Sequence, residues 1–380
     1  MAETLSTFHV NTEKGWRGGE QQMSYLMEGL RSRGHGVEVA VQPEGEARRR
    51  LEARGFSVHP IEMRGEADPV AILALARRMG SVRPDVVHLH TSHAHTLGTV
   101  AARLAGRPIV VVSRRVDFSI FRNSFLGLNG IKYRMGLDRI VCVSDAVRDV
   151  LVRDGLSPER LRVVRSAVDP ARIRDAAPVD VRRRLDLPPA ARIVLAVGAL
   201  VDHKGHKFLV EAWPKVVAAV PDAYLVIAGE GPLRASLGEL AKALWVDRRI
   251  AFAGLVDDLP GWFASADLLC MPSVAEGLGT SVLDGMVAGL AIVATRAGGI
   301  PEMVRHDVEG LLVEPGDSAG LGDALVRVLS DGDLRARLGA AARRRVDDAF
   351  HVDRMVDETV AVYAEALRER RTPDRMPSPI

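Results

Sequence analysis

The sequence repeats one structural plan twice: short β-branched runs alternate with helix-length amphipathic stretches, and the series starts again in mid-chain. Such alternation is typical of parallel βαβ sheets. At 380 residues the chain has room for two domains of ordinary size. The first series predicts strands at residues 8–11, 37–41, 85–90, 108–113 and 139–144, and the second predicts strands at 193–200, 223–229, 249–253, 267–273 and 291–296.

The position of the restart sets the expected domain boundaries. Residues 1–170 are predicted to form the first domain and residues 190–345 the second. Between them, residues 171–189 are rich in Arg, Asp, Ala and Pro and lack a sustained apolar run, which indicates an interdomain connector. A C-terminal helix is expected over 346–368, packing back on the first domain. The polar, proline-containing residues 369–380 are expected to form a disordered tail.

Composition excludes several classes of function. Lys plus Arg number 51 and Asp plus Glu 49, a formal net charge of +2, so the chain has no overall field that would attract nucleic acid. Cys142 and Cys270 lie in separate apolar runs, which indicates buried thiols and not a disulfide framework. The start lacks a signal-peptide pattern, and no window reaches the roughly 20 apolar residues of a membrane span. We expect a cytoplasmic protein.

The strongest motif spans residues 272–284, with the sequence PSVAEGLGTSVLD. It follows an expected strand and opens an apolar-periodic helix, so free N–H groups and the helix dipole would form an anion site. Glu276 and Asp284 frame this site, and carboxylates accept hydrogen bonds from hydroxyl groups. An ordinary βα turn with a surface glutamate is the alternative.

This motif resembles the signature of retaining glycosyltransferases of the GT4 type. That resemblance implies an α/β protein with the GT-B fold, in which two Rossmann-like parallel-sheet domains face each other across a cleft, and a nucleotide-diphosphate sugar as donor. Other segments match in the family's order over roughly residues 10–365. They are a glycine loop at 18–20, a D-x-x-H-x-H strand at 85–90, a VSxxV-type strand from 140, a VGRL…KG-type segment at 197–205, a strand at 252–254 and a GGxPE turn at 298–302.

The resemblance also implies residue roles. Glu276 would contact donor-sugar hydroxyls, and Asp284 stands where the family usually has a ribose-binding glutamate. His90 matches a histidine near the donor sugar, and Lys204 a residue that neutralises the diphosphate. The expected catalytic residues are therefore His90, Glu276 and Lys204, and the expected donor-binding residues are Gly18, Gly19, Gly198, Lys204, Gly254, Val256, Glu276, Gly277, Leu278, Gly279, Thr280 and Asp284.

The chain departs from the family at Ala199, where an arginine usually assists the lysine. Another cation is then expected beside the diphosphate, and the candidates are His203, His206, Lys207 and Arg17.

Four histidines, His88, His90, His93 and His95, crowd one segment. Strand alternation puts His88 and His90 on one face. Because imidazole is the commonest metal ligand, a metal site formed by the four is one alternative, and a satisfied core histidine at position 90 is another. No Cys or carboxylate completes a set nearby, and the family that the chain resembles is metal-independent, so neither a metal nor another cofactor is expected.

Two other ligand classes are excluded by spacing. The segment GEGP at 229–232 lacks the spacing of a dinucleotide fingerprint, and the chain contains no Walker-type phosphate loop.

Residues 114–126 gather three of the nine phenylalanines with three arginines. Such a stretch would suit an anionic membrane surface or a phosphorylated acceptor lipid, and ordinary helix packing is the alternative. The expected acceptor or membrane contacts are Arg17, Arg115, Phe121 and Arg122.

The resemblance thus implies a retaining glycosyltransferase that moves a sugar from a nucleotide-diphosphate sugar to a glycan or glycolipid acceptor. Surface polysaccharide or lipopolysaccharide synthesis is the expected setting, in the cytoplasm with peripheral contact at the inner membrane surface. Two alternatives stay open: a nucleotide-sugar-binding protein without turnover, and a nucleotide-sugar epimerase of the same fold.

Overall fold

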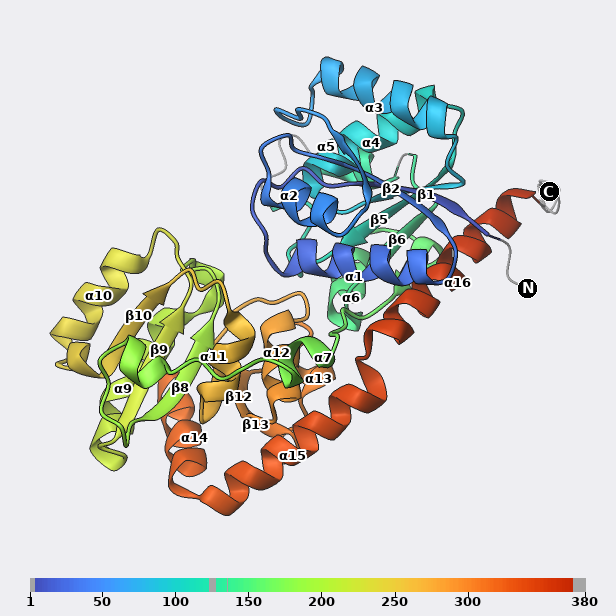
Figure 1. The fold of residues 1–380 in the computed structure, drawn as a ribbon. Helices are drawn as coiled ribbons and strands as arrows, with labels where there is room; N and C mark the ends of the chain where they lie inside the picture. Colours follow the sequence, from blue (N-terminus) through green and yellow to red (C-terminus); the bar gives the residue numbers. More distant parts are fainter. Residues whose placement is uncertain (1–3, 123–127, 135, 372–380) are drawn as a thin grey trace. The chain divides into compact units, whose positions relative to one another are not determined.

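The structure, a computed structural model, describes residues 4–122, 128–134 and 136–371. The chain forms two compact units, one from Met1–Ser166 with Val352–Ile380 and the other from Ala167–His351. In each unit, helices cover a parallel β-sheet (Figure 1). The two parallel α/β sheets predicted from the alternation are confirmed.

Within the described residues, the first unit has a seven-stranded sheet in the order β3-β2-β1-β4-β5-β6-β7, with every neighbouring pair parallel. The strand order reverses between β1 and β4, and open sheets of this kind bind ligands at the carboxyl ends of the strands beside such a switch. The strands are β1 (Ser6–Val10), β2 (Gly36–Val41), β3 (Ser57–Pro60), β4 (Val86–Leu89), β5 (Ile109–Arg114), β6 (Arg139–Cys142) and β7 (Leu161–Val163). The α-helices are α1 (Gly18–Ser32), α2 (Glu46–Ala53), α3 (Pro69–Val82), α4 (Ser92–Leu104), α5 (Leu128–Arg134), α6 (Asp145–Arg153) and α16 (Val352–Arg371).

The second unit has a six-stranded parallel sheet in the order β10-β9-β8-β11-β12-β13, with its switch between β8 and β11. Its strands are β8 (Arg192–Val197), β9 (Ala223–Ala228), β10 (Ile250–Gly254), β11 (Leu268–Met271), β12 (Ala291–Thr295) and β13 (Gly310–Val313). Its α-helices are α7 (Ala171–Arg174), α8 (Val181–Arg184), α9 (His206–Ala219), α10 (Arg234–Ala243), α11 (Leu259–Ser265), α12 (Thr280–Ala288), α13 (Ile300–Met303), α14 (Ser318–Ser330) and α15 (Gly332–Ala349).

Central strands are buried along their whole length because helices cover both faces of each sheet. Strands β4, β6, β11 and β12 are buried at every position, which explains their continuous apolar runs. Three strands were not predicted, namely β3, β7 and β13. All three are short and lie at sheet edges, where one side is unpaired, and the apolar pattern is weak in β3 and β7.

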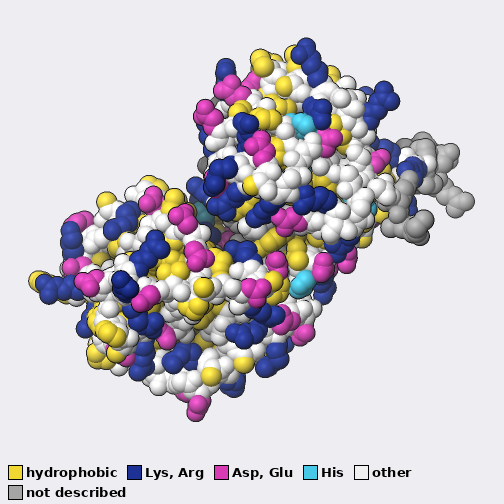
Figure 2. Space-filling view, in the orientation of Figure 1, with side chains coloured by type: hydrophobic (Ala, Val, Ile, Leu, Met, Phe, Trp, Pro, Cys, Tyr) yellow, Lys and Arg dark blue, Asp and Glu magenta, His cyan; other side chains and the backbone are white. Residues whose placement is uncertain are grey.

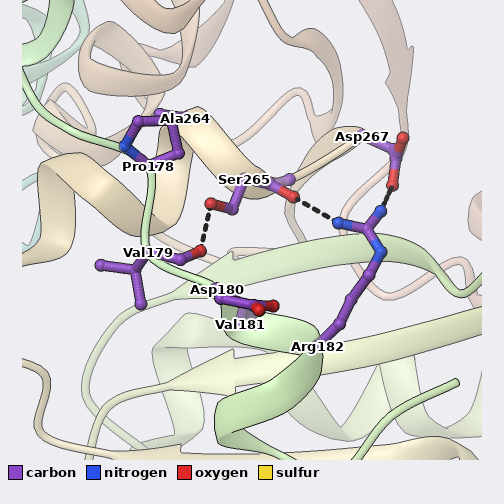
Figure 3. Close-up of a pocket in the computed structure, with 9 residues that line it drawn as sticks. Pro178, Val179, Asp180, Val181, Arg182, Ala264, Ser265 and Asp267 are labelled. Carbon is purple, nitrogen blue, oxygen red and sulfur yellow. Dashed lines mark hydrogen bonds and ion pairs between the residues drawn. The ribbon is translucent and has the colours of Figure 1, made fainter. Parts of the chain in front are cut away.

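The segment expected as a connector, residues 171–189, lies within the second unit and carries α7 and α8. The Arg182 guanidinium donates to the Ala191 carbonyl over 2.9 Å and pairs with Asp267 at 3.1 Å. The Ser265 hydroxyl donates to the Val179 carbonyl, on the rim of a surface hollow (Figure 3). The segment is therefore fastened to α11 and β11 by polar contacts that its composition did not indicate.

The last described helix, α16, belongs to the first unit and packs beside α1 (Figure 1). It begins at Val352 and not at 346, because α15 continues to Ala349. Arg33 pairs with Asp353 at 3.2 Å and with Asp357 at 2.9 Å. Residues 369–371 complete α16, and the rest of the expected tail lies outside the described residues.

The contact between α1 and α16 predicts an effect on stability. A Cβ atom at Gly29 would lie 2.4 Å from Val356 Cγ2, so Gly29→Ala should lower the free energy of unfolding. We expect a loss of about 1–3 kcal/mol in urea unfolding, as is usual for overpacking against a stiff side chain. The control Gly80→Ala, in α3, has open space around its added methyl group and should gain up to about 1 kcal/mol from helix propensity. The pair Gly29→Ala/Val356→Ala should cost less than the sum of its single changes, and strict additivity would contradict the close contact.

Candidate functional site

Two loops interlock at the carboxyl edge of the second sheet, one after β8 and one after β11. The backbone N–H groups of Val274 and Ala275 both donate to the His203 carbonyl, over 2.8 and 3.2 Å. Gly205 has a positive φ of 67°, and a Cβ there would lie 2.0 Å from the Pro272 carbonyl oxygen. Only glycine combines this conformation with this close approach.

The interlock brings Lys204 and Glu276 together. The Lys204 ammonium donates to Glu276 Oε2 in an ion pair whose side chains are 20% and 12% exposed. The Ser273 hydroxyl donates to the same oxygen over 3.3 Å, and the Gly299 N–H donates to the Glu276 carbonyl over 3.2 Å. The carboxylate is therefore held from its side chain and from its backbone.

The N-terminus of α12 follows directly. Its N-cap is Gly279, in the left-handed conformation, and no side chain caps it. The first N–H groups of a helix have no partner within the helix, and they attract anions together with the helix dipole. Lys204, Glu276 and these N–H groups thus form one polar cluster, which we call the loop cluster.

Other predicted donor residues lie along the same edge. A Cβ atom added at Gly198 would lie 3.6 Å from Lys204 Cδ, so the two residues are neighbours. The N–H of Gly229 donates to the Gly254 carbonyl over 2.8 Å, at the end of β10, two residues before Val256. Leu278 is buried and anchors the β11 loop in the core.

Asp284 points inward, and Arg172 from α7 pairs with it at 2.7 Å. Burial raises the pKa of the Asp284 carboxyl, and the Arg172 guanidinium opposes that rise. The acid expected at the ribose is therefore already paired within its own unit.

The cations proposed to replace the missing arginine differ in their surroundings. Burial and the nearby Lys204 lower the pKa of His206 to about 4, so this side chain is neutral at pH 7. Lys207 is exposed and lies 3.6 Å from Glu211. The His203 carbonyl accepts both hydrogen bonds from the β11 loop. Arg17 is the exposed N-cap residue of α1, in the first unit.

In the first unit, the predicted glycine loop opens α1. The buried Glu20 accepts hydrogen bonds from the Arg17 N–H and from the Asn11 amide, each over 3.0 Å. Arg115, just after β5, lies against Gly19. A Cβ atom added at Gly19 would lie 3.6 Å from Arg115 Cδ. The glycine loop and a half-buried guanidinium are therefore neighbours.

His90 lies in a buried cluster of three histidines. The rings of His88 and His90 are stacked with centroids 4.3 Å apart, as strand alternation predicts. His9 on β1 completes the cluster, and its Nδ1 lies 3.0 Å from His90 Nε2. Burial, with smaller contributions from His88, His9 and Arg115, holds the pKa of His90 well below its ordinary value.

The metal set weighed from the sequence is not assembled. His93 is exposed, and His95 is buried on α4 with its ring 4.7 Å from Tyr133. The described residues instead bring ring nitrogens of His9, His88 and His90 within 4.8 Å of one another. Both nitrogens of His88 and of His9 have hydrogen-bond partners, which fits a protein network better than a metal site.

The aromatic and basic stretch is described only in part. Arg122 stacks over the Phe118 ring, 4.2 Å from its centroid, and Phe121 is 44% exposed. Residues 123–127 lie outside the described residues.

Sequence reasoning missed Arg172, His9 and Tyr363. Arg172 sits in a segment interpreted as a connector, and Tyr363, which bonds His88 Nδ1 over 2.5 Å, comes from the far C-terminal α16. For His9, the only available signal was its place in the first expected strand, at residues 8–11. That place does not reveal which strand lies beside it.

Comparisons with known proteins identify the family. The Glycosyltransferase Family 4 model matches residues 16–172, and the Glycosyl transferases group 1 model matches residues 191–331. A 2-deoxystreptamine glucosyltransferase of Streptomyces kanamyceticus is 30% identical, over 76% of this chain and 79% of its own length. The chain belongs to glycosyltransferase family 4. The resemblance stated from the sequence is confirmed.

Two further proteins resemble this family 4 chain. The lipopolysaccharide core biosynthesis glycosyltransferase LpsE of Rhizobium meliloti is 31% identical, over 62% of this chain and 66% of its own length. The structure of Anabaena HepE with UDP and glucose has a TM-score of 0.84 at 18% identity, covering 95% of this chain and 100% of HepE. That likeness shows the fold, so the two parallel-sheet units are those of a GT-B glycosyltransferase.

The surface agrees with the near-zero net charge. Lys and Arg side chains are interspersed with Asp and Glu over the face in view (Figure 2). Among the described helices of the family 4 chain, none is long and apolar enough to cross a membrane.

The pair Arg172–Asp284 predicts a pH-dependent stability. Because burial raises the folded-state pKa of Asp284 above the unfolded value of about 3.9, its ionisation opposes folding, and stability falls as the pH rises through the folded-state pKa. Arg172→Met removes the favourable partner of the carboxylate. It should destabilise the protein by about 1–3 kcal/mol at pH 7 and by less near pH 4, in thermal unfolding.

The double variant Arg172→Met/Asp284→Asn is the control, because it has no carboxylate to titrate at this position. Its loss of stability relative to the single variant Asp284→Asn should vary less with pH than the loss that Arg172→Met causes in the wild type. A destabilisation by Arg172→Met that is the same at pH 4 and pH 7 would contradict this account.

Proposed function

We propose that this family 4 glycosyltransferase takes its sugar from a nucleotide-diphosphate donor and transfers it, with retention at the anomeric carbon, to a glycan or glycolipid acceptor. The observation that carries the proposal is the Lys204–Glu276 pair beside the uncapped N-terminus of α12. This loop cluster combines a cation, N–H donors and a hydroxyl-accepting carboxylate, which are the three chemistries that a sugar diphosphate requires.

The chemical difficulty of such a transfer is the charge on the leaving diphosphate. Lys204 and the first N–H groups of α12 would stabilise it, and both lie on loops at the same edge of the second sheet. Glu276 would accept hydrogen bonds from the sugar hydroxyls. Gly198, Gly254, Val256, Gly277, Leu278, Gly279 and Thr280 belong to the loops and strand ends along this edge and are proposed to line the donor site. In this scheme no protein nucleophile is required.

The first unit would supply the remaining groups. Gly18 and Gly19 would let backbone approach the donor phosphate, and His90 would contact the donor sugar. Arg115 lies beside Gly19, which favours an acceptor-side role for it over membrane contact, and Arg17 is proposed to act there too. Membrane contact through Phe121 and Arg122, on the cytoplasmic face, stays a prediction of the sequence.

Two similarities support the substrate classes. HepE of Anabaena was crystallised with UDP and with UDP-glucose, so uridine nucleotides are the first donors to try. LpsE is named for lipopolysaccharide core biosynthesis, which supports a surface polysaccharide or lipopolysaccharide acceptor. We also propose that no metal takes part, since hydrogen bonds within the protein engage both ring nitrogens of His9 and of His88.

A binding protein without turnover is the second candidate. Ala199 lacks the family's arginine, and Asp284 is paired with Arg172. Either departure would weaken diphosphate or ribose contacts. Release of nucleoside diphosphate coupled to a glycosylated product separates the two candidates, because a binding protein forms neither.

Substitutions at the loop cluster test the proposed donor site. Glu276→Gln should lower the rate of transfer at least about tenfold, which corresponds to an activation free energy higher by roughly 1.4 kcal/mol. The dissociation constant for UDP or GDP should stay within about twofold of the wild-type value. Lys204→Met should weaken binding of the same diphosphate at least about tenfold and that of the free nucleoside by less than about twofold, measured by calorimetry.

The matched control is Lys242→Met, which breaks the exposed pair with Glu239 on α10 of the same unit. It should change neither binding nor transfer. Equal losses of diphosphate and nucleoside affinity in Lys204→Met would remove Lys204 from the diphosphate site, and full transfer by Glu276→Gln would remove Glu276 from the sugar site.

A further inference from the structure

A column of buried polar side chains crosses the centre of the first sheet. Thr7 and His9 are two residues apart on β1 and therefore lie on the same face of the sheet. His88 on β4 lies beside His9 in the parallel register, and His90 follows two residues later. All four are at most 4% exposed. Buried polar groups need hydrogen-bond partners, so the bonds within this column determine where each proton lies.

The first proton is fixed by Thr7. Its hydroxyl lies 2.9 Å from the Gly36 carbonyl oxygen, and a carbonyl can only accept, so the single hydroxyl proton points to Gly36. The Thr7 oxygen is then an acceptor for its other neighbour, His9 Nε2, at 3.2 Å. His9 must therefore carry a proton on Nε2.

The second proton follows from the first. Burial lowers the pKa of His9 to about 3, so the ring is neutral, and protonation at Nε2 leaves Nδ1 as an acceptor. His90 Nε2 lies 3.0 Å from that Nδ1 and must donate to it. In a neutral His90 ring the other nitrogen, Nδ1, is then a bare acceptor. It is buried and has no hydrogen-bond partner among the described residues.

The surroundings keep His90 neutral. Burial disfavours the charged ring most, and the stacked His88 ring, His9 and the Arg115 guanidinium disfavour a positive charge further. His88 is itself occupied, with Tyr363 at Nδ1 over 2.5 Å and Ser113 at Nε2 over 2.8 Å. A cationic imidazolium or a bound metal ion would add charge to this desolvated region.

We propose that Thr7 and His9 are positioning residues that hold His90 in its Nε2–H tautomer, so that Nδ1 is an acceptor reserved for a substrate hydroxyl group. The inference rests on the proposed function, because that function supplies a sugar as the source of the hydroxyl. A bare nitrogen lone pair accepts O–H and repels phosphate oxygens, so His90 would select the sugar and not the diphosphate. Since the ring stays neutral, it acts through this hydrogen bond and not as a carrier of protons.

Nitrogen-15 NMR of the histidine rings tests the relay directly, with His90→Gln used for assignment. In the wild type, His9 and His90 should both be protonated at Nε2 and bare at Nδ1. Thr7→Val removes the acceptor of the His9 proton with little change of shape, so both rings should shift toward the Nδ1–H form. Thr7→Ser keeps the hydroxyl and should restore the wild-type spectrum.

Kinetics of the same variants test the link to substrate. Thr7→Val should lower kcat/KM for the sugar nucleotide about tenfold and leave binding of the nucleoside diphosphate, which lacks the sugar, unchanged. Thr7→Ser should retain the wild-type value. A purely structural role of Thr7 would instead weaken nucleoside diphosphate binding as well.

The outcomes separate the two proposals. A wild type that neither binds nor uses nucleotide sugars ends the proposed function, and the NMR experiment still decides the relay. Turnover with His90 protonated at Nδ1, or a Thr7→Val variant with unchanged tautomers or unchanged kcat/KM, overturns the inference. Titration with Zn²⁺ that binds one ion per chain and removes the His90 Nε2–H signal would overturn it in favour of a metal site.

Discussion

The ion pair between Lys204 and Glu276 is the contact on which the loop cluster depends. It joins the loop after β8 to the loop after β11, on either side of the strand switch of the second sheet. The two loops can come close enough for this pair because Gly205 leaves room for the Pro272 carbonyl. The His203 carbonyl also accepts hydrogen bonds from two N–H groups of the loop after β11. Backbone packing thus brings both charges to the carboxyl edge, where the first turn of α12 adds its N–H groups.

The two units provide contrasting polar environments. The second unit offers full charges in partly exposed loops, which suits recognition of a diphosphate. The first unit offers neutral, buried imidazoles, which suit recognition of hydroxyl groups. A buried polar network of this kind is costly unless every member has a hydrogen-bond partner. In the Thr7–His9–His90 relay, one described histidine nitrogen, His90 Nδ1, has no such partner, and a ligand group would complete the network there.

Much of this organisation could be predicted from the sequence. Apolar periodicity predicted both parallel sheets, and the motif at 272–284 predicted the turn before α12, because local patterns determine local structure. The pairing of Asp284 with Arg172 could not be predicted, since it joins a buried helix to a segment whose composition is that of a linker. Nor could the role of His9, because sequence alternation gives the face of a strand but not the neighbouring strand or its register. Edge strands such as β3 were missed for the related reason that few of their residues are buried.

The most direct test of the account is thermal unfolding of the wild type against nucleosides, their monophosphates and their diphosphates, for uracil, guanine, adenine and cytosine. Ligand that binds only the native state raises stability by about 2.7 kcal/mol at a hundredfold excess over its dissociation constant. We predict that one base is preferred and that stabilisation rises from nucleoside to monophosphate to diphosphate, because the donor site proposed at the loop cluster would attract phosphate charge. Stabilisation that is equal for a nucleoside and its diphosphate, or absent throughout for folded protein, would contradict a diphosphate site at Lys204 and α12.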